Sequence, residues 1–313
     1  MIASVNFQWS SSAFSRRLRQ LRVYTPMIRR VDWLVMFTFA RLEILQRYAG
    51  RKRRRSSLLP QATPKSAVLQ TELPAQEIAH HVRVDGLADG LRLSEDAVAD
   101  VKSFAASAPC YGNVERQLPL DRSSSGCLMP GDAVVGDYLD GIADCETIRH
   151  MWVDPIILEI AGACLGTRPL PLRSRLWWSF RADQATATTR SVYAQDCFHF
   201  DLDNWRAVKF FFYMTDVGPE NGPHIYVRKS HRNRSVLDQL SPFKSRSDRH
   251  IIAKYGRDNL VVMQGPAGTG FVEDPFGFHT GTSVTGTARL ILEIEYGVAQ
   301  TPLAGPYYVP TIE

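Results

Sequence analysis

Residues 198–232 constrain the fold of this chain more than any other part of its 313 residues. The segment opens on His199-Phe200-Asp201 and continues into the aromatic run KFFFY at 209–213, which is typical of a buried strand. Because side chains alternate along a strand, His199 and Asp201 leave the backbone on the same face. We therefore predict a β-rich fold that presents a histidine and a carboxylate side by side.

A third candidate ligand is His279, which follows Asp201 by 78 residues in the segment FGFHTG. Two ligands from one strand and one from a distant strand can occupy three neighbouring positions around a metal ion. This is the 2-His-1-carboxylate arrangement of non-haem Fe(II) oxygenases, which leaves the opposite side of the metal open. The triplet taken alone also fits a surface histidine beside a solvated carboxylate. The buried strand and the turn-rich surroundings of His279 favour the metal site.

Arg289 lies ten residues after His279 and opens another apolar strand at 290–296. A guanidinium group binds a carboxylate through two parallel hydrogen bonds, so this position suits an anionic co-substrate. The alternative is an arginine that only supports the end of the strand.

At these residues the chain resembles the phytanoyl-CoA dioxygenase family of Fe(II)/2-oxoglutarate-dependent oxygenases. The shared blocks are AQDCFHFD, KFFFYMTDVGPENGPHIYV, SHR and GPAGTGFVEDPFGFHTGTSVTGTARLILEIEY, between residues 194 and 296. The resemblance implies that His199, Asp201 and His279 bind the iron. It also implies that Arg289 holds the distal carboxylate of 2-oxoglutarate.

The reaction implied by this resemblance uses Fe(II), 2-oxoglutarate and O2, and converts 2-oxoglutarate to succinate and CO2. An unidentified small-molecule or acyl-type substrate would be hydroxylated. Halogenating relatives replace the carboxylate ligand by a small residue, whereas Asp201 is present here, so hydroxylation is favoured. One departure is Arg228-Lys229 before Ser230-His231, where the family usually has Pro-Gly. A non-catalytic barrel that binds or senses a ligand is the alternative.

Softer candidates are the residues Trp178 and Tyr193, which we expect to help bind the co-substrate from strands that face the pocket, and Arg181 nearby. Core packing is the open alternative for each. We interpret His224 and His231 as structural.

The order of elements predicts an α+β fold that is mainly β. Helices are expected at 95–108, with Ser94 as N-cap, at 146–153 and again from Asp154-Pro155 to about Gly166. Short strands separated by Gly and Pro turns then follow, at 172–180, 191–200, 208–215, 224–227, 260–263, 269–273 and 288–297. The resemblance narrows this to a double-stranded β-helix, a jelly-roll or cupin-like barrel with helices packed on one face. We expect the oxygenase domain at 66–313, with its helical part at about 84–170 and its β-helix core at about 171–300.

The charge is unevenly distributed along the chain. Residues 1–60 hold 13 Lys and Arg against 2 Asp and Glu, whereas residues 61–313 hold 24 against 30. We interpret residues 1–65 as a basic extension and linker. Disorder, peripheral membrane contact through residues 1–55 and organelle targeting are its three open interpretations. The apolar run WLVMFTFA at 33–40 is far shorter than the ~20 residues that span a bilayer.

The remaining features exclude several classes of protein. The acidic balance of residues 61–313 gives no support to a nucleic-acid groove. The five cysteines form no Cys-x-x-Cys pair, which is typical of a reducing compartment and predicts a cytoplasmic protein. Membrane association through the basic segment is the alternative location. Neither the substrate nor the oligomeric state follows from the sequence.

Overall fold

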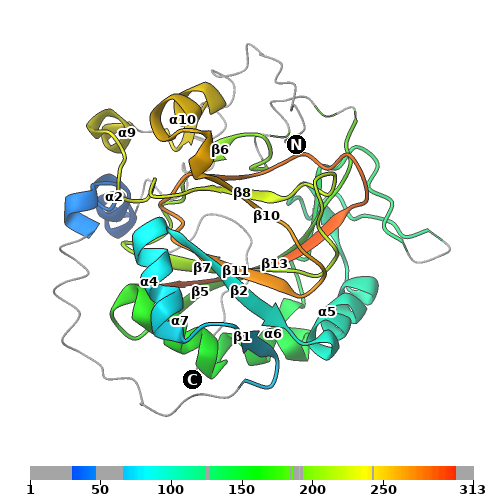
Figure 1. Ribbon diagram of the computed structural model, residues 1–313. Coiled ribbons are helices and arrows are strands. Elements are labelled where there is room, and N and C mark those ends of the chain that lie inside the picture. Colours follow the sequence, from blue (N-terminus) through cyan, green and yellow to red (C-terminus); the bar gives the residue numbers. More distant parts are fainter. Residues whose placement is uncertain are drawn as a thin grey trace.

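The structure is a computed structural model that describes residues 30–46, 66–123, 127–183, 185, 190, 193–241 and 243–300. Its core consists of two antiparallel sheets that face each other (Figure 1). In spatial order the large sheet contains β1 (Leu69–Thr71), β2 (Leu87–Leu93), β11 (Thr269–Glu273), β7 (Ala207–Tyr213), β13 (Arg289–Gly297), β5 (Leu170–Ser179), β4 (Val135–Asp137) and β3 (Tyr111–Gly112). The small sheet contains β10 (Leu260–Met263), β8 (His224–Val227), β12 (His279–Gly281), β6 (Phe198–His199) and β9 (Ser245–Arg246). The predicted double-stranded β-helix is confirmed.

Alternation along β13 shows how the sequence separates the two faces of the large sheet. One set of its side chains packs with the helices in the largest apolar cluster: Leu290, Leu292, Ile294 and Tyr296. Ile291 faces the other way and packs with Phe211 of β7 and Tyr226 of the opposite sheet. The residues in phase with Ile291 therefore line the interior between the sheets.

Four helices cover the outer face of the large sheet: α4 (Ala75–Asp85), α5 (Glu95–Ser107), α6 (Glu146–Trp152) and α7 (Pro155–Leu165). The predicted starts and stops are confirmed. Ser94 accepts a hydrogen bond from the Ala97 amide, and Asp154 accepts from two amides at the start of α7. Gly166 ends α7 in the left-handed conformation with φ 71°. Two short 3-10 helices lie at Ile142–Asp144 and Arg257–Asn259.

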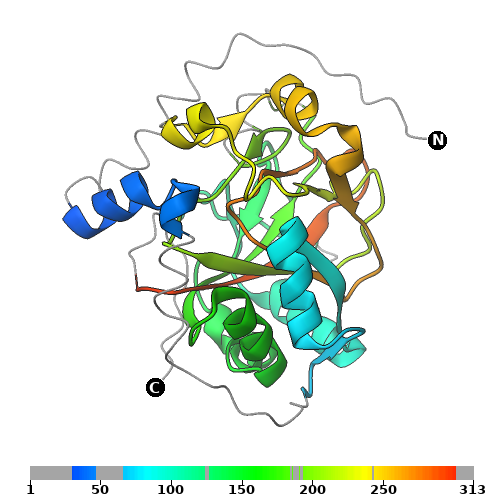
Figure 2. The same ribbon diagram turned by 60° about the vertical axis from the view of Figure 1, so that its left-hand side comes forward.

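Three further helices lie on the side of the small sheet: α2 (Val31–Phe39), α9 (Val236–Leu240) and α10 (Asp248–Tyr255), as Figures 1 and 2 show. Trp33 and Met36 of α2 are buried in a cluster with Phe200 and Phe278. Residues 30–46 of the basic segment are therefore packed against the barrel, which the sequence did not predict. None of the described helices combines the length and the apolar character needed to cross a bilayer.

Helices α4, α9 and α10 and strand β9 were not predicted. Strands β1 to β4 were not predicted, although β2 pairs with β11 and extends the large sheet. The strand predicted at 191–200 is reduced to β6, because Ala194 and Asp196 have left-handed backbone angles of φ 60° and φ 51° and form a turn. Residues 191 and 192 of that prediction lie outside the described residues. All five cysteines are free thiols.

Candidate metal centre

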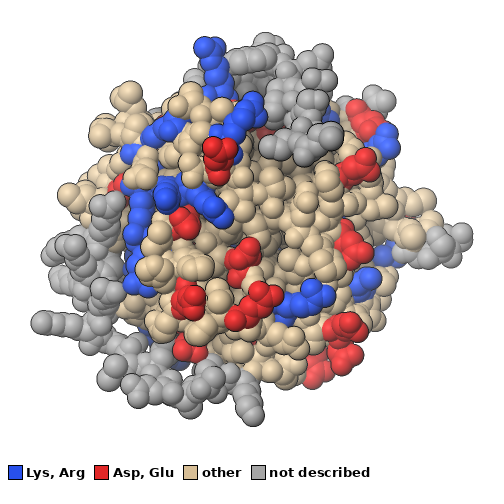
Figure 3. Space-filling view, viewed as in Figure 1, with Lys and Arg blue, Asp and Glu red and all other residues tan. Residues whose placement is uncertain are grey.

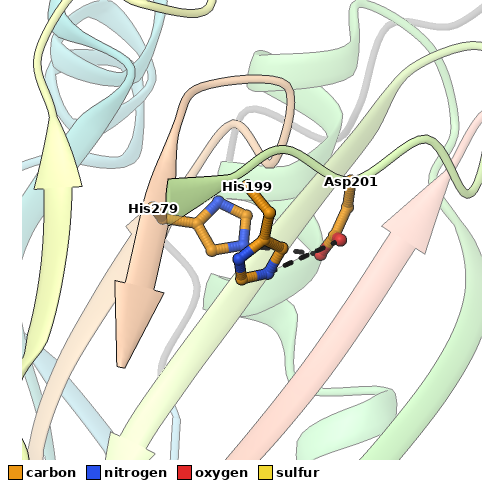
Figure 4. A group of neighbouring side chains, drawn as sticks. All are labelled: His199, Asp201 and His279. Carbon is orange, nitrogen blue, oxygen red and sulfur yellow. Dashed lines mark ion pairs between the residues drawn. The ribbon is translucent and has the colours of Figure 1, made fainter. Parts of the chain in front are cut away.

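The three predicted ligands meet between the two sheets, as Figure 4 shows. His199 ends β6 and His279 begins β12, and the two residues are direct partners across these strands. Asp201 follows β6, where its backbone amide donates to the Pro275 carbonyl at 2.7 Å. One potential ligand atom from each of the three side chains lies within 4.8 Å of the others. This set of two imidazoles and one carboxylate could hold one metal ion.

Backbone carbonyls orient both histidine rings. His199 Nδ1 donates to the Cys197 carbonyl, and His279 Nδ1 donates to the Gly277 carbonyl, each at 3.0 Å. The Nε2 atoms then face Asp201, at 3.9 Å from Oδ1 for His199 and 3.5 Å from Oδ2 for His279. A hydrogen bond at Nδ1 fixes which nitrogen is left to bind a metal.

The protonation of the triad suits a cation. Burial and the neighbouring His279 lower the pKa of His199 to about 3, so its imidazole is neutral. Burial acts to raise the pKa of Asp201, but Lys209 and His279 outweigh it and hold that pKa well below its usual value. Burial acts to lower the pKa of His279, but the neighbouring carboxylates of Glu273 and Asp201 outweigh it and raise that pKa above its usual value. A metal ion at its Nε2 would take the place of that proton.

A second layer of polar side chains supports His279 from behind. Glu273 Oε2 lies 2.8 Å from His224 Nε2, and its Oε1 lies 3.6 Å from His279 Nδ1. The His224 ring stacks on the His279 ring with centroids 5.5 Å apart. His224, which we interpreted as structural, thus packs directly against a candidate metal ligand. The sequence patterns did not identify Glu273. Its position at the end of a predicted strand was the one signal that could have indicated it.

Two lysines form ion pairs with the carboxylate of Asp201. Lys209 Nζ lies 2.6 Å from Asp201 Oδ2, and Lys244 Nζ lies 3.8 Å from Oδ1. Lys209 belongs to a group of paired charges on the inner faces of β4, β5, β7 and β13, together with Asp203 just after the triad, which we call the charged wall. Its members are Asp137, Arg173, Arg175, Asp203, Lys209, Glu293 and Glu295. The sequence did not predict this wall.

The charges of the wall are unequal in strength. Burial raises the pKa of Glu295 to about 8, although Lys209 and Arg173 act to lower it. At Glu293, Arg173 and Lys209 outweigh burial and lower the pKa to about 2. The two neighbouring glutamates of β13 are thus shifted in opposite directions, with the pKa of Glu293 lowered and that of Glu295 raised.

Arg289 lies at the start of β13 and is almost completely buried. Its Nη2 donates to Ser179 Oγ at 3.0 Å, and its Nη1 donates to the Gly222 carbonyl. Its Nε has no hydrogen-bond partner among the described residues. A side chain built at Gly281, two residues after His279, would lie 3.5 Å from Nη2. The guanidinium therefore adjoins the strand of a candidate ligand.

The softer candidates separate into two groups. Tyr193 packs against the apolar cluster between the sheets, on the side of the triad. Trp178 lies on the other face of β5, where it packs with the helical layer and its Nε1 donates to Tyr138 Oη at 3.0 Å. The structure does not bring Trp178 to the triad, because Arg173, Arg175, Trp177 and Ser179 occupy the inner face of this strand. Arg181 is exposed and pairs with Asp183.

The fold and the triad together define a double-stranded β-helix with a 2-His-1-carboxylate site. Residues 122–289 match the family model described as phytanoyl-CoA dioxygenase (PhyH). The match covers more than half of the chain, and the chain belongs to this family. It is therefore a protein of the Fe(II)/2-oxoglutarate-dependent oxygenase class, with Fe(II), 2-oxoglutarate and O2 as its cofactor and co-substrates.

Several solved structures are similar to this fold. The 2-oxoglutarate-dependent epimerase SnoN from nogalamycin biosynthesis is 16% identical, with 71% of this chain and 82% of that chain covered at a TM-score of 0.48. AviO1 from Streptomyces viridochromogenes Tue57 is 17% identical over 75% of this chain and 100% of its own, at a TM-score of 0.49. EctD from S. alaskensis is 16% identical, with 81% of this chain and 92% of that chain covered at a TM-score of 0.45. No curated protein matches the sequence.

Proposed function

We propose that this protein is an Fe(II)- and 2-oxoglutarate-dependent hydroxylase of a small-molecule or acyl-type substrate, and that residues 66–313 form its catalytic domain. In this proposal His199, Asp201 and His279 are the metal ligands. The observation that carries the proposal is the meeting of their three ligand atoms within 4.8 Å between the sheets. Imidazole and carboxylate ligands in this ratio are those of non-haem Fe(II) oxygenases.

The residues around the triad fit both iron and 2-oxoglutarate. The low pKa of His199 and the ionised Asp201 match the neutral imidazole and the carboxylate that a divalent cation requires. Arg289 offers a buried guanidinium beside Gly281, and its Nε lacks a hydrogen-bond partner among the described residues. A carboxylate would satisfy that guanidinium through charge-assisted hydrogen bonds. We therefore assign Arg289 to the distal carboxylate of 2-oxoglutarate and Tyr193 to the wall of the same pocket.

The bound iron and 2-oxoglutarate would supply the oxidising chemistry, and the protein positions and protects the site. The carbonyls of Cys197 and Gly277 hold the two imidazoles, and Lys209 holds one carboxylate oxygen of Asp201. The other oxygen, Oδ1, lies 3.9 Å from His199 Nε2 and 3.8 Å from Lys244 Nζ. The charged wall and the apolar cluster on either side exclude bulk water from this region.

Two features support hydroxylation over the alternatives. Asp201 occupies the position where halogenating relatives have a small residue, so the carboxylate fills the place that a halide would need. The non-catalytic barrel would be favoured by loss of a ligand or of the arginine, and this chain retains all four residues.

The test is succinate formation from 2-oxoglutarate by anaerobically Fe(II)-loaded protein on exposure to air, with Asp201→Ala as the control. Succinate from the wild type that is absent with the variant supports the proposal. Mass spectrometry of candidate substrates then distinguishes hydroxylation, which adds one oxygen atom, from an isomerisation, which leaves the mass unchanged. Substrates that are consumed without a gain of oxygen would overturn the hydroxylase assignment.

A further inference from the structure

Helix α2 is apolar apart from Asp32 and Thr38, which are both exposed, and only one of its faces packs against the barrel. Trp33 and Met36 are buried, whereas Val31, Val35 and Phe39 follow one another at intervals of four residues along the opposite face. Val31 is 74% exposed, and Val35 and Phe39 are more than 40% exposed. The outer face of a surface helix is normally mainly polar, whereas here three large apolar side chains are exposed beside one aspartate and one threonine, which is unusual for a helix that borders only water.

Helix α9 adds a second set of exposed apolar side chains beside α2. Leu237 is 81% exposed, and Val236 and Leu240 exceed 60%. The opposite side of α9 is fixed by Asp238, which is buried and pairs with Arg246. Both helices are thus rigidly attached, and each turns apolar side chains away from the protein.

Hydrogen bonds join the two helices into one surface. The amide of Glu43, just after α2, donates to Gln239 Oε1 of α9 at 3.0 Å. Arg234, just before α9, donates from its amide to Glu43 Oε1 at 2.8 Å and from Nη2 to the Arg41 carbonyl at 3.1 Å. We call the exposed set the apolar patch; its members are Val31, Val35, Phe39, Ile44, Val236, Leu237 and Leu240.

The charge around the apolar patch is positive, in contrast to the rest of the barrel. Residues 228–257, which contain α9 and α10, hold 9 Lys and Arg against 2 Asp, whereas the other residues after 60 hold 15 against 28. Figure 3 shows this separation, with blue side chains gathered over the region of α9 and α10 and red side chains prominent over the helical layer. Exposed basic residues stand on both sides of α9: Arg228, Lys229, Arg232, Arg249, Lys254 and Arg257.

The sequence on either side of α2 has the same sign. Residues 16–29 contain five arginines and residues 47–55 contain six Lys and Arg, with no acidic residue in either stretch. In the sequence, both stretches directly adjoin the described segment 30–46.

We propose that the apolar patch docks on the surface of an anionic lipid bilayer. Apolar side chains that enter the interface, surrounded by lysine and arginine that attract acidic headgroups, are the two components of peripheral membrane binding. A bilayer also suits this surface, because the separate apolar side chains of two short neighbouring helices can each insert between lipid headgroups. This inference is independent of the chemistry of the metal centre.

The test is co-sedimentation of the full-length protein with vesicles of phosphatidylcholine containing about 30% phosphatidylserine, and with pure phosphatidylcholine vesicles. The wild type binds the anionic vesicles, and its binding falls at high salt because screening weakens the headgroup attraction. Leu237→Glu on α9 and Val35→Glu on α2 each lower the vesicle-bound fraction by about tenfold, because each places a charge in the apolar interface. Val153→Glu is the matched control: Val153 is 50% exposed but lies in the helical layer of the large sheet, so its binding is unchanged.

Three outcomes would overturn the proposal. The wild type fails to bind anionic vesicles, or both glutamate variants bind as well as the wild type, which would leave the basic stretches alone responsible. Alternatively, the wild type self-associates in a concentration-dependent manner that Leu237→Glu abolishes, which would make a second copy of the chain the occupant. Unchanged thermal unfolding of the variants shows that any loss of binding is not a loss of fold.

Discussion

Lys209 is a buried cation that pairs with several acidic side chains beside the triad, and we expect the stability of the fold to depend on it. Its side chain is 2% exposed, and its Nζ lies 2.6 Å from Asp201, 3.5 Å from Glu293 and 3.7 Å from Asp203. Replacement by methionine keeps the length of the side chain and removes the charge. Four acids that share this cation then remain in a buried site with only Arg173 and Lys244 as paired Lys or Arg side chains among the described contacts: Asp201, Asp203, Glu293 and Glu295.

The cost follows from the burial of these partners. Breaking a buried ion pair by removing one member costs about 3–5 kcal/mol of unfolding free energy, because the remaining charge is left uncompensated. For a chain of this size each kcal/mol lowers the melting temperature by about 2–4 °C. We therefore expect Lys209→Met to unfold about 6–20 °C below the wild type.

Lys244→Met is the matched control, because this lysine also approaches Asp201. Its Nζ is 3.8 Å from Oδ1 and its side chain is 14% exposed, so solvent weakens the pair. We expect this variant to lose about 1 kcal/mol or less. Circular dichroism melting curves of all three proteins, recorded with a chelator to remove metal, measure both effects on the same scale.

Lys209→Met should also bind metal more weakly. A side chain that orients a ligand typically contributes about 10–100-fold in metal affinity. Isothermal titration with a redox-stable divalent ion measures this separately from stability. A Lys209→Met protein that melts within 2 °C of the wild type, or no lower than Lys244→Met, would refute the reasoning.

Three further predictions concern other parts of the chain. Arg289→Lys weakens 2-oxoglutarate binding by about tenfold or more without weakening metal binding, because lysine cannot form the bidentate contact; a titration of the metal-loaded variant checks this. Burial lowers the pKa of His231 below its usual 6.5, so the unfolded state binds more protons below that pH and unfolding free energy falls on acidification. Urea unfolding of chelated protein at about pH 7 and pH 5 should show a shallower fall in His231→Gln, and an equal fall would contradict it. Asp238→Ala costs about 3 kcal/mol in thermal unfolding, since it leaves Arg246 without its buried partner; a loss of under 1 kcal/mol would contradict this.

The sequence predicted the triad from a local, periodic signal at His199 and Asp201 and from a family resemblance that added the distant His279. His199 and Asp201 are two residues apart, and Arg289 opens a strand that the pattern LILEIEY defines. Helices α5 and α7 were predicted for a similar reason, since Ser94, Asp154 and Gly166 act within one turn of the helix ends.

The inward face of β5 could not be predicted in the same way. Its segment LRSRLWWSF alternates, and either set of side chains is compatible with a strand. The expectation that Trp178 lines the pocket took the aromatic phase as the inner one. In the structure the inner phase carries Arg173 and Arg175, which pair with acids on other strands such as Glu293 and Asp137. Such long-range pairing is invisible in the alternation of one segment.

The packing of α2 was unpredictable for a related reason. The run at 33–40 is apolar on all sides, so its sequence does not distinguish the face that contacts Phe200 and Phe278 from the face that remains exposed. We interpreted residues 1–60 from their overall positive charge, and this did not indicate that the short helix α2 within them packs against the barrel.

The most direct test of the metal centre is an anaerobic titration of the protein with Fe(II) followed by 2-oxoglutarate, monitored by the weak visible absorption of the Fe(II)–2-oxoglutarate chelate. The account predicts that the band appears in the wild type, saturates with one equivalent of each, and is absent from Asp201→Ala. Folded, iron-loaded wild-type protein that develops no band would contradict the assignment of His199, Asp201, His279 and Arg289.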